Sequence, residues 1–79
     1  MVNYESAVPP SRQVAGELRR RIQSGEIPPG GKLPSINDLM AAYGIARNTA
    51  AKALKILRDE GLIETVRGWG SFTITPEDS

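Results

Sequence analysis

Two short amphipathic segments, with a break at Gly44 between them, limit the folds that this chain can adopt. Apolar residues recur at positions i, i+3, i+4 and i+7 within residues 36–43, and a similar spacing returns within residues 50–57. Each segment therefore has one stripe to bury, and Gly44 between them can take the left-handed conformation that ends a helix. The sequence predicts two helices joined by a sharp turn, with Ile45 as an apolar plug between the two stripes.

Capping signals mark the starts of the predicted helices. Ser35 can accept a hydrogen bond from the first orphan backbone donors, and Asp38 can reach back to the backbone of Ser35 in a capping box. An earlier helix is predicted to be capped by Ser11 and to end at Gly25. Its apolar positions recur at helical spacing and are Val14, Ala15, Leu18 and Ile22.

The stretch after Gly61, the expected residue past the last helix, is predicted to form a β-hairpin. Residues 62–66 and 72–74 are rich in β-branched and aromatic side chains, and residues 67–71 join them through two glycines. The hairpin is expected to bury Leu62, Phe72 and Ile74 on the helices. The predicted fold is mainly α with a small β-hairpin. The domain is expected to span residues 11–75, between a flexible arm at 1–10 and a disordered tail at 76–79.

Charge is distributed unevenly along the chain although its net value is small. Ten Lys and Arg against nine Asp and Glu give a net charge of +1, which does not by itself argue for a nucleic-acid partner. From residue 39 to residue 58, however, every charged residue is basic. Helical geometry places the apolar stripe of residues 50–57 on one side of the last helix and a polar face on the other. That face comprises Arg47, Asn48, Ala51, Lys52 and Lys55. A binding face and a solvated helix face both fit this pattern.

The run Arg19-Arg20-Arg21 is the most basic stretch, and we interpret it as a solvated surface. Consecutive residues fan around a helix, so only one or two of them can face the same partner. Glu17 is also placed to pair with Arg20 or Arg21. At most one contact to a phosphate backbone is expected from this run.

Composition excludes several classes of function. A chain of 79 residues forms one small domain with little room for a second site. Cysteine and histidine are both absent, so disulfides, thiolate or imidazole metal sites and the usual general bases are missing. No enzyme activity, cofactor or metal is therefore expected. The longest apolar runs are far shorter than the ~18 residues that cross a bilayer, and no secretory signal is visible at the start, so a reducing cytoplasm is expected.

Several short motifs in a fixed order resemble one known family. They are G-E-I-P-P-G-G-K-L-P-S from Gly25, D-L-M-A-A-Y-G-I-A-R-N-T-A from Asp38, A-L-K-I-L-R-D-E-G-L-I-E from Ala53 and R-G-W-G-S-F from Arg67. Together they look like the winged helix-turn-helix domain of GntR-family bacterial transcription regulators. The resemblance implies three helices plus a two- to three-stranded antiparallel wing. It also implies that a short extended piece near Lys32 and Leu33 can pair with the hairpin.

A helix-turn-helix of this kind places the first residues of its second helix in the ~12 Å major groove of DNA. The residues expected at base edges are Arg47, Asn48, Ala51 and Lys52, because arginine can pair with guanine, asparagine with adenine, and alanine can pack on a thymine methyl. The residues expected at phosphates are Lys52, Lys55, Thr49, Ser35 and Asn37.

The expected wing contacts come from four residues at the hairpin tip. Arg67 could enter a minor groove or hold a phosphate, and Gly68 and Gly70 allow close backbone approach. Trp69 has two interpretations: it contacts DNA, or it folds back and packs on its own domain.

The chain departs from the family pattern at three positions of the helix pair. Family members usually carry serine or threonine at the position of Ala46, where it caps the recognition helix, and many carry arginine at those of Asn37 and Ala51. Direct base readout is therefore expected to be leaner here. The family also normally adds a larger effector-binding and dimerising domain, which these residues lack. An effector ligand is expected only if the native chain has a further domain, and a homodimer on DNA stays open.

These observations favour sequence-specific binding of a double-stranded DNA operator by a bacterial transcriptional regulator. We expect a repressor that is located in the cytoplasm at the nucleoid and has no membrane partner. The alternative is a winged-helix module that binds protein rather than DNA. The small net charge, Ala46 and Trp69 motivate that alternative.

Overall fold

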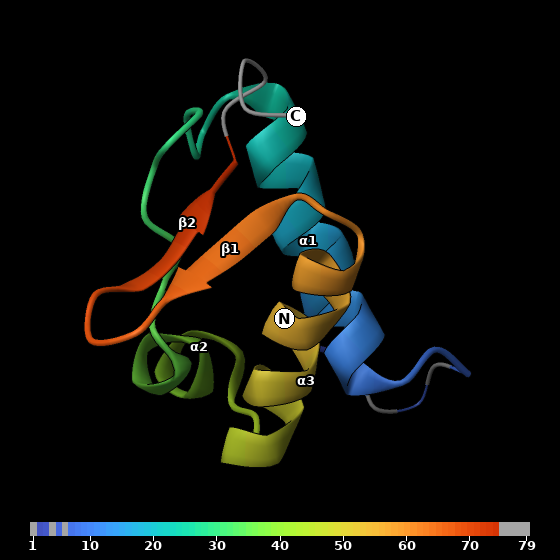
Figure 1. Ribbon diagram of the computed structural model, residues 1–79. Coiled ribbons are helices and arrows are strands. Elements are labelled where there is room, and N and C mark those ends of the chain that lie inside the picture. Colours follow the sequence, from blue (N-terminus) through green and yellow to red (C-terminus); the bar gives the residue numbers. More distant parts are fainter. Residues whose placement is uncertain (1, 4, 6, 75–79) are drawn as a thin grey trace.

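The computed structural model describes residues 2–3, 5 and 7–74, so the predicted tail at 76–79 lies outside the described residues. The elements follow in the order α1 (Pro10–Ser24), α2 (Ile36–Tyr43), α3 (Arg47–Asp59), β1 (Ile63–Val66) and β2 (Gly70–Thr73), shown in Figure 1. The two strands form one antiparallel sheet. The predicted class, helices with a small hairpin in winged helix-turn-helix order, is confirmed.

Helix α1 begins earlier than the sequence predicted. Its cap position is Pro9 and its first residue is Pro10, so the prediction that Ser11 caps this helix is wrong. Proline suits the first helical position because its fixed φ matches the helix and its missing N–H would have no intrahelical partner there. The helix ends at Gly25, as predicted.

The helix pair forms as the capping signals predicted. The Ser35 hydroxyl accepts from the Asp38 backbone N–H at 3.0 Å, and the Asp38 carboxylate accepts from the Ser35 N–H at 3.1 Å. Gly44 ends α2 with φ 63°, which a residue with a side chain adopts only at a cost. Ile45 is 5% exposed and so is the buried plug of the turn. Helix α3 then begins after Ala46 without a side-chain cap, as the missing hydroxyl predicted.

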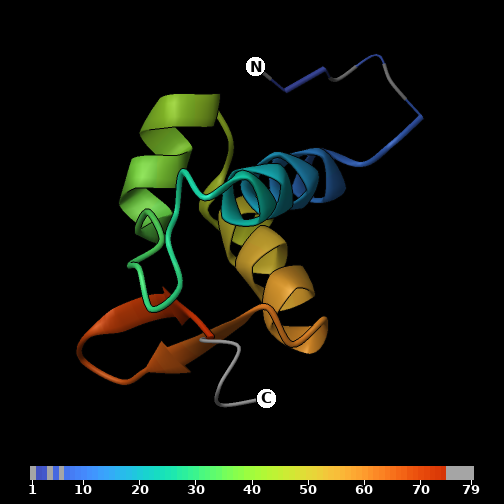
Figure 2. The same cartoon turned by 90° about the horizontal axis from the view of Figure 1, so that it is seen from above.

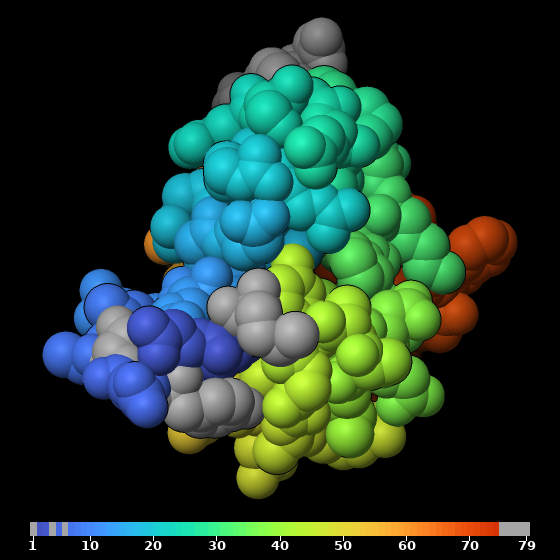
Figure 3. Space-filling model, turned by 180° about the vertical axis from the view of Figure 1, so that it is seen from behind, coloured from blue at the N-terminus to red at the C-terminus, as the bar shows by residue number. Residues whose placement is uncertain are grey.

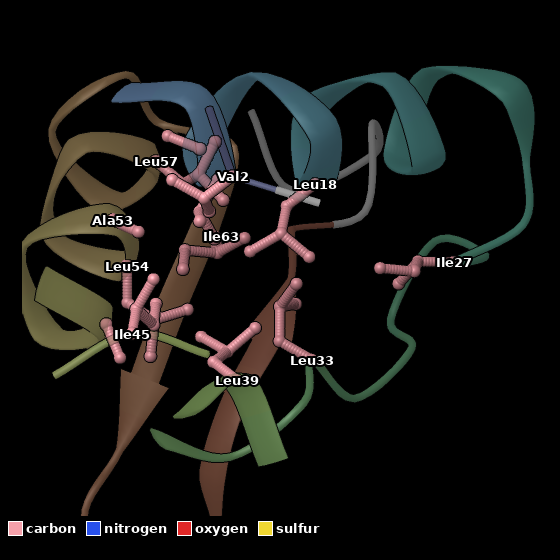
Figure 4. Packing of buried hydrophobic residues seen from close by; sticks show 13 residues of the cluster. Val2, Leu18, Ile27, Leu33, Leu39, Ile45, Ala53, Leu54, Leu57 and Ile63 are labelled. Carbon is pink, nitrogen blue, oxygen red and sulfur yellow. The ribbon is translucent and has the colours of Figure 1, made fainter. Parts of the chain in front are cut away.

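A single core joins the three helices to the first strand. Helix α1 lies across α3, with α2 beside them and the hairpin on the far side, as Figure 2 shows. Leu18, Leu57 and Ile63 converge from α1, α3 and β1 in the cluster of Figure 4. Each is at most 1% exposed, and full burial of such a side chain stabilises the fold by about 1.5–3 kcal/mol.

Part of the predicted flexible arm contacts this core. Val2 is 9% exposed and belongs to the core cluster. The Gln13 side chain accepts from the Asn3 N–H at 2.7 Å and donates to the carbonyls of Asn3 at 2.6 Å and Val8 at 2.8 Å. An amide in α1 therefore holds the backbone of the arm beside the domain.

The wing pairs over more residues than predicted. Val66 pairs with Gly70 and Thr65 with Ser71, so the connection is residues 67–69 rather than 67–71. The predicted inward face is wrong for Phe72 and Ile74, which are half-buried, whereas Ser71 and Thr73 are buried beside Ile63. Leu62 is half-buried and packs against the core, as predicted.

The inward hydroxyl of Thr73 has a structural reason. Thr73 Oγ1 accepts from the Gly31 N–H at 2.9 Å and donates to the Pro28 carbonyl at 2.6 Å. It thus ties β2 to a turn that the Gly31 N–H and the Pro28 carbonyl already close with a bond of 2.8 Å. The loop also adds a strand-like edge. Leu33 N–H donates to the Ser71 carbonyl at 2.8 Å and Thr73 N–H to the Gly31 carbonyl at 2.9 Å. The predicted pairing near Lys32 and Leu33 is confirmed by the bridge between Lys32 and Phe72.

Candidate nucleic-acid interface

The polar face of α3 is uncovered in the folded domain. Its buried stripe consists of Ala50, Ala53, Leu54 and Leu57. The residues predicted for the opposite face, Arg47, Asn48, Ala51, Lys52 and Lys55, are all exposed. Thr49, on the flank of the helix, is half-buried. The apolar side thus packs on the core while the basic and amide-bearing side stays open to a partner.

A groove runs between the start of α2, one flank of α3 and the wing. It has a volume of about 480 Å³, and we call it the α3–wing groove. Leu33, Ile36 and Leu54 supply apolar surface to it. Its polar lining includes Lys32, Ser35, Asn37, Arg47, Arg58 and Thr65. Five of the predicted site residues therefore line one groove: Ser35, Asn37, Arg47 and Ala51 from the helix pair, and Gly70 from the wing.

Arg47 and Asn37 are hydrogen-bonded across the turn. A terminal nitrogen of the Arg47 guanidinium donates to Asn37 Oδ1 at 2.9 Å, and both residues are exposed. A guanidinium has five N–H donors, so this bond leaves enough donors for a bidentate contact. Asn37 can therefore orient Arg47 without consuming its capacity to read a base.

The three consecutive arginines of α1 are paired with carboxylates. Arg19 meets Glu60 at 2.6 Å, Arg20 meets Glu17 at 2.7 Å and Arg21 meets Glu26 at 3.2 Å. The hydrogen bond from Arg20 lowers the pKa of Glu17, and that from Arg19 lowers the pKa of Glu60. The predicted pairing of Glu17 with this run is confirmed, and the charge of the run is largely balanced.

The cations around α3 and the wing contrast with the arginine run of α1. Within the described part of the chain, six basic residues form no ion pair with a carboxylate. One of them, Arg12, is on α1, and the other five lie around α3 and the wing: Lys32, Arg47, Lys52, Arg58 and Arg67. Lys55 is the exception, because it meets Asp59 at 2.7 Å one turn further along, and that hydrogen bond lowers the pKa of Asp59. Positive potential is therefore concentrated on the groove, the outer face of α3 and the wing.

Two cations of this surface were missed by sequence reasoning. Lys32 follows two glycines in a loop, and only the pairing of that loop with β2 brings it to the groove. Arg58 lies eleven residues after Arg47, which is about three helical turns, so a helical wheel could have placed both on one flank. Arg58 donates to Thr65 Oγ1 at 3.2 Å, and this hydroxyl lies 3.2 Å from that of Ser71.

The wing tip stands apart from the groove. Arg67, Gly68 and Trp69 are exposed, and Trp69 is 72% exposed, so the interpretation in which it packs on its own domain is wrong. Among the described residues, no group of His, Cys, Asp and Glu could hold a metal ion. In the same part of the chain, no helix is long and apolar enough to cross a bilayer.

Comparison with known proteins identifies the family of this fold. The family model described as "Bacterial regulatory proteins, gntR family" matches residues 10–73. The HTH-type transcriptional repressor NagR of Bacillus subtilis is 34% identical over 76 residues, which are 96% of this chain and 31% of NagR. The HTH-type transcriptional repressor YtrA of the same organism is 35% identical over 71 residues, 90% of this chain and 55% of YtrA. The chain thus spans about a third to a half of the lengths of these two relatives.

A solved structure resembles this domain over most of its length. The DNA-binding domain of AraR, crystallised in complex with operator ORR3, superposes with a TM-score of 0.82 at 36% identity, covering 92% of this chain and 88% of that one. These matches confirm the predicted winged helix-turn-helix class. They also confirm the predicted assignment to DNA-binding transcription regulators rather than enzymes. The chain belongs to the GntR family of bacterial regulatory proteins.

Proposed function

We propose that this domain binds operator DNA with the first half of α3 in the major groove and the wing on the adjacent minor groove or backbone. The observation that carries the proposal is the concentration of cations without ion-pair partners on one surface, across α3, the α3–wing groove and the wing. Affinity for duplex DNA comes largely from neutralising phosphates, so unpaired cations contribute more than paired ones. The repressor function of NagR and YtrA supports a repressor role for the protein containing this domain.

Base readout is assigned to the exposed residues at the start of α3. Arg47, held by Asn37, is suited to a bidentate contact with a guanine. Asn48 is suited to an adenine, and the methyl of Ala51 to a thymine methyl. Lys52 lies on the outer side of the same helix face and can reach a base edge or a phosphate.

Phosphate contacts are assigned to groups that flank the base-reading residues. Ser35 and Asn37 lie at the start of α2, where backbone N–H groups and the helix dipole favour an anion. Thr49 and Lys55 flank α3, and the structure adds Lys32 and Arg58 in the groove. At the wing, Arg67 is proposed to enter the minor groove, while Gly68 and Gly70 let the backbone approach the sugar–phosphate chain.

The wider assembly follows from the family and is part of the proposal. We infer a homodimer on paired half-sites and a location in the cytoplasm at the nucleoid, with an effector ligand only if the native chain has a further domain. Half-sites one helical turn apart would match two-fold symmetry of the protein. Selection of bound duplexes from a random pool tests specific binding and the homodimer. It should return two related half-sites; a single preferred site would contradict the homodimer, and recovery of random sequence alone would contradict specific binding.

A second candidate function is binding of a protein partner, favoured by the 72% exposure of Trp69. Backbone amide shifts distinguish the two functions. Added operator should move the amides of residues 47–55, whereas a protein-binding module would leave them unmoved and respond at Trp69 only to a protein.

A further inference from the structure

The wing tip carries an exposed apolar surface that the core does not use. Among the described residues, the large hydrophobic side chains with high exposure are Val8 at 44%, Val66 at 40% and Trp69 at 72%. Two of these three lie at the tip of the hairpin, and Figure 3 shows the wing as an orange-red projection beyond the body of the domain. A large indole that is 72% exposed to water indicates a binding role.

The backbone makes this tip narrow and fixed. Trp69 N–H donates to the Val66 carbonyl at 2.9 Å and closes a four-residue turn in which Gly68 has φ 83°. Gly70 follows with φ 114°, and a Cβ there would lie 3.0 Å from Cε of Lys32. The turn therefore has a glycine on each side of Trp69, and the indole is the only bulky group between them.

The charge around the tip favours an anionic ligand, such as a nucleic acid, over a neutral or basic protein surface. Residues 65–74 contain no acidic residue, and Arg67 lies two residues before the indole. The α3–wing groove, with Lys32 and Arg58, begins at Gly70 on the body side of the tip. A ligand that meets Trp69 thus also meets cations at the tip and at the base of the wing.

We propose that Trp69 acts as a wedge, inserting its indole from the minor groove between two base pairs and partly unstacking them. This inference rests on the proposed function. Minor-groove proteins insert apolar side chains in this way and kink the duplex toward the major groove. Pyrimidine–purine steps unstack most easily, so the wing selects such a step without hydrogen bonds to its base edges. Arg67 is attracted to the negative potential of the minor groove and holds the tip in place.

The chain suits a direct optical test because Trp69 is its only tryptophan. A duplex taken from the random-pool selection is titrated into the domain while indole emission and its quenching by acrylamide are followed. Stacking on a base should quench the emission and protect the indole from acrylamide. 2-Aminopurine placed at the step under the wing should brighten on binding, because it is released from its neighbours.

Variants separate the wedge from a general loss of binding. Trp69→Ala should weaken operator affinity roughly five- to hundredfold and abolish the 2-aminopurine signal, whereas Trp69→Phe keeps part of both. Val8→Ala is the matched control, since it removes another exposed apolar side chain and should change neither. Circular dichroism establishes that each variant is folded.

The outcomes distinguish this inference from the proposed function. In one outcome, operator binds and shifts the amides of α3, but it changes neither indole emission nor acrylamide quenching, and Trp69→Ala binds as tightly as the wild type. This outcome refutes the wedge and leaves DNA binding intact. If no duplex binds at all, both are refuted. An indole that responds to a second copy of the chain or to another protein, and not to DNA, also overturns the wedge.

Discussion

Helix α1 and helix α3 carry similar numbers of basic residues but use them differently. The arginine run of α1 is balanced by Glu17, Glu26 and Glu60, with separations of 2.6–3.2 Å. On α3, only Lys55 meets a carboxylate among the described residues. A count of charges therefore does not distinguish the two helices, which carry four basic residues and one acidic residue each. The pairing of each charge, which depends on the fold, supports the proposal that α3 and the groove beside it bind DNA.

Removing one arginine from each helix tests this contrast most strongly. Arg47→Ala should weaken operator binding by about 1–3 kcal/mol and relax the preference at one base pair, because it deletes the proposed guanine contact. Arg20→Ala, from the paired run, is the control and should leave affinity nearly unchanged. Fluorescence anisotropy with operator and with duplexes altered at each position measures both effects. Equal losses for the two variants would contradict the contrast.

The start of α3 is also less secured than that of α2, which has a complete capping box. Ala46→Ser should supply the missing acceptor and raise the free energy of unfolding by about 1 kcal/mol. Ala46→Val is the control, since it enlarges the side chain without adding a hydroxyl and valine caps a helix no better than alanine. Urea denaturation followed by circular dichroism gives both values. A serine variant no more stable than the wild type would show that this helix start needs no cap.

The two lysines of α3 refine the contrast within a single helix. Lys52→Ala should lower the slope of log affinity against log salt by about 0.9, the value for one lost phosphate contact. Lys55→Ala should lower it by less, because Asp59 already compensates the Lys55 charge at 2.7 Å. Binding measured from low to high salt gives the two slopes. A larger change for Lys55 than for Lys52 would show that the Asp59 pair opens on DNA.

The smallest expected effect concerns the acidic partners of α1. The pKa of Glu60 is lowered in the folded state, chiefly by its hydrogen bond from Arg19. Its contribution to stability is therefore present above the unfolded-state pKa and is lost as pH falls through the lower folded-state value. Glu60→Gln should reduce the loss of folding stability that occurs as the pH falls through this range. It should not change DNA binding at neutral pH. Thermal unfolding from acid to neutral pH measures the stability of the variant and of the wild type. Identical dependence of stability on pH in the two proteins would contradict this contribution of Glu60.

Much of the fold could be predicted because its signals are local. Helical spacing, Gly44 and the capping box of Ser35 and Asp38 depend on neighbours in the sequence, and each was confirmed. The wing register could not be predicted in this way. Ser71 and Thr73 are less apolar than Phe72 and Ile74, yet they are the buried pair, and the Thr73 hydroxyl bonds to loop backbone at Pro28 and Gly31, more than forty residues earlier.

The same distinction applies to the candidate interface. The exposed face of α3 follows from helical geometry, so its residues could be named from the sequence. Lys32 reaches the interface only through a contact between segments forty residues apart, its bridge to Phe72. The Arg47–Asn37 bond likewise depends on the angle between α2 and α3. Which arginines are paired with acids was visible in the sequence only for Glu17 and Arg20, which are neighbours on one helix.

The most direct test of the account is a titration of isotopically labelled domain with its selected operator duplex, followed by backbone and arginine side-chain NMR signals. The account predicts the largest shifts at residues 47–55, at Lys32 and Arg58 in the α3–wing groove, and at residues 67–70 of the wing. The guanidinium signals of Arg19, Arg20 and Arg21 should remain unmoved. Larger shifts at α1 than at α3 would contradict the central claim that the unpaired cations form the DNA-binding surface.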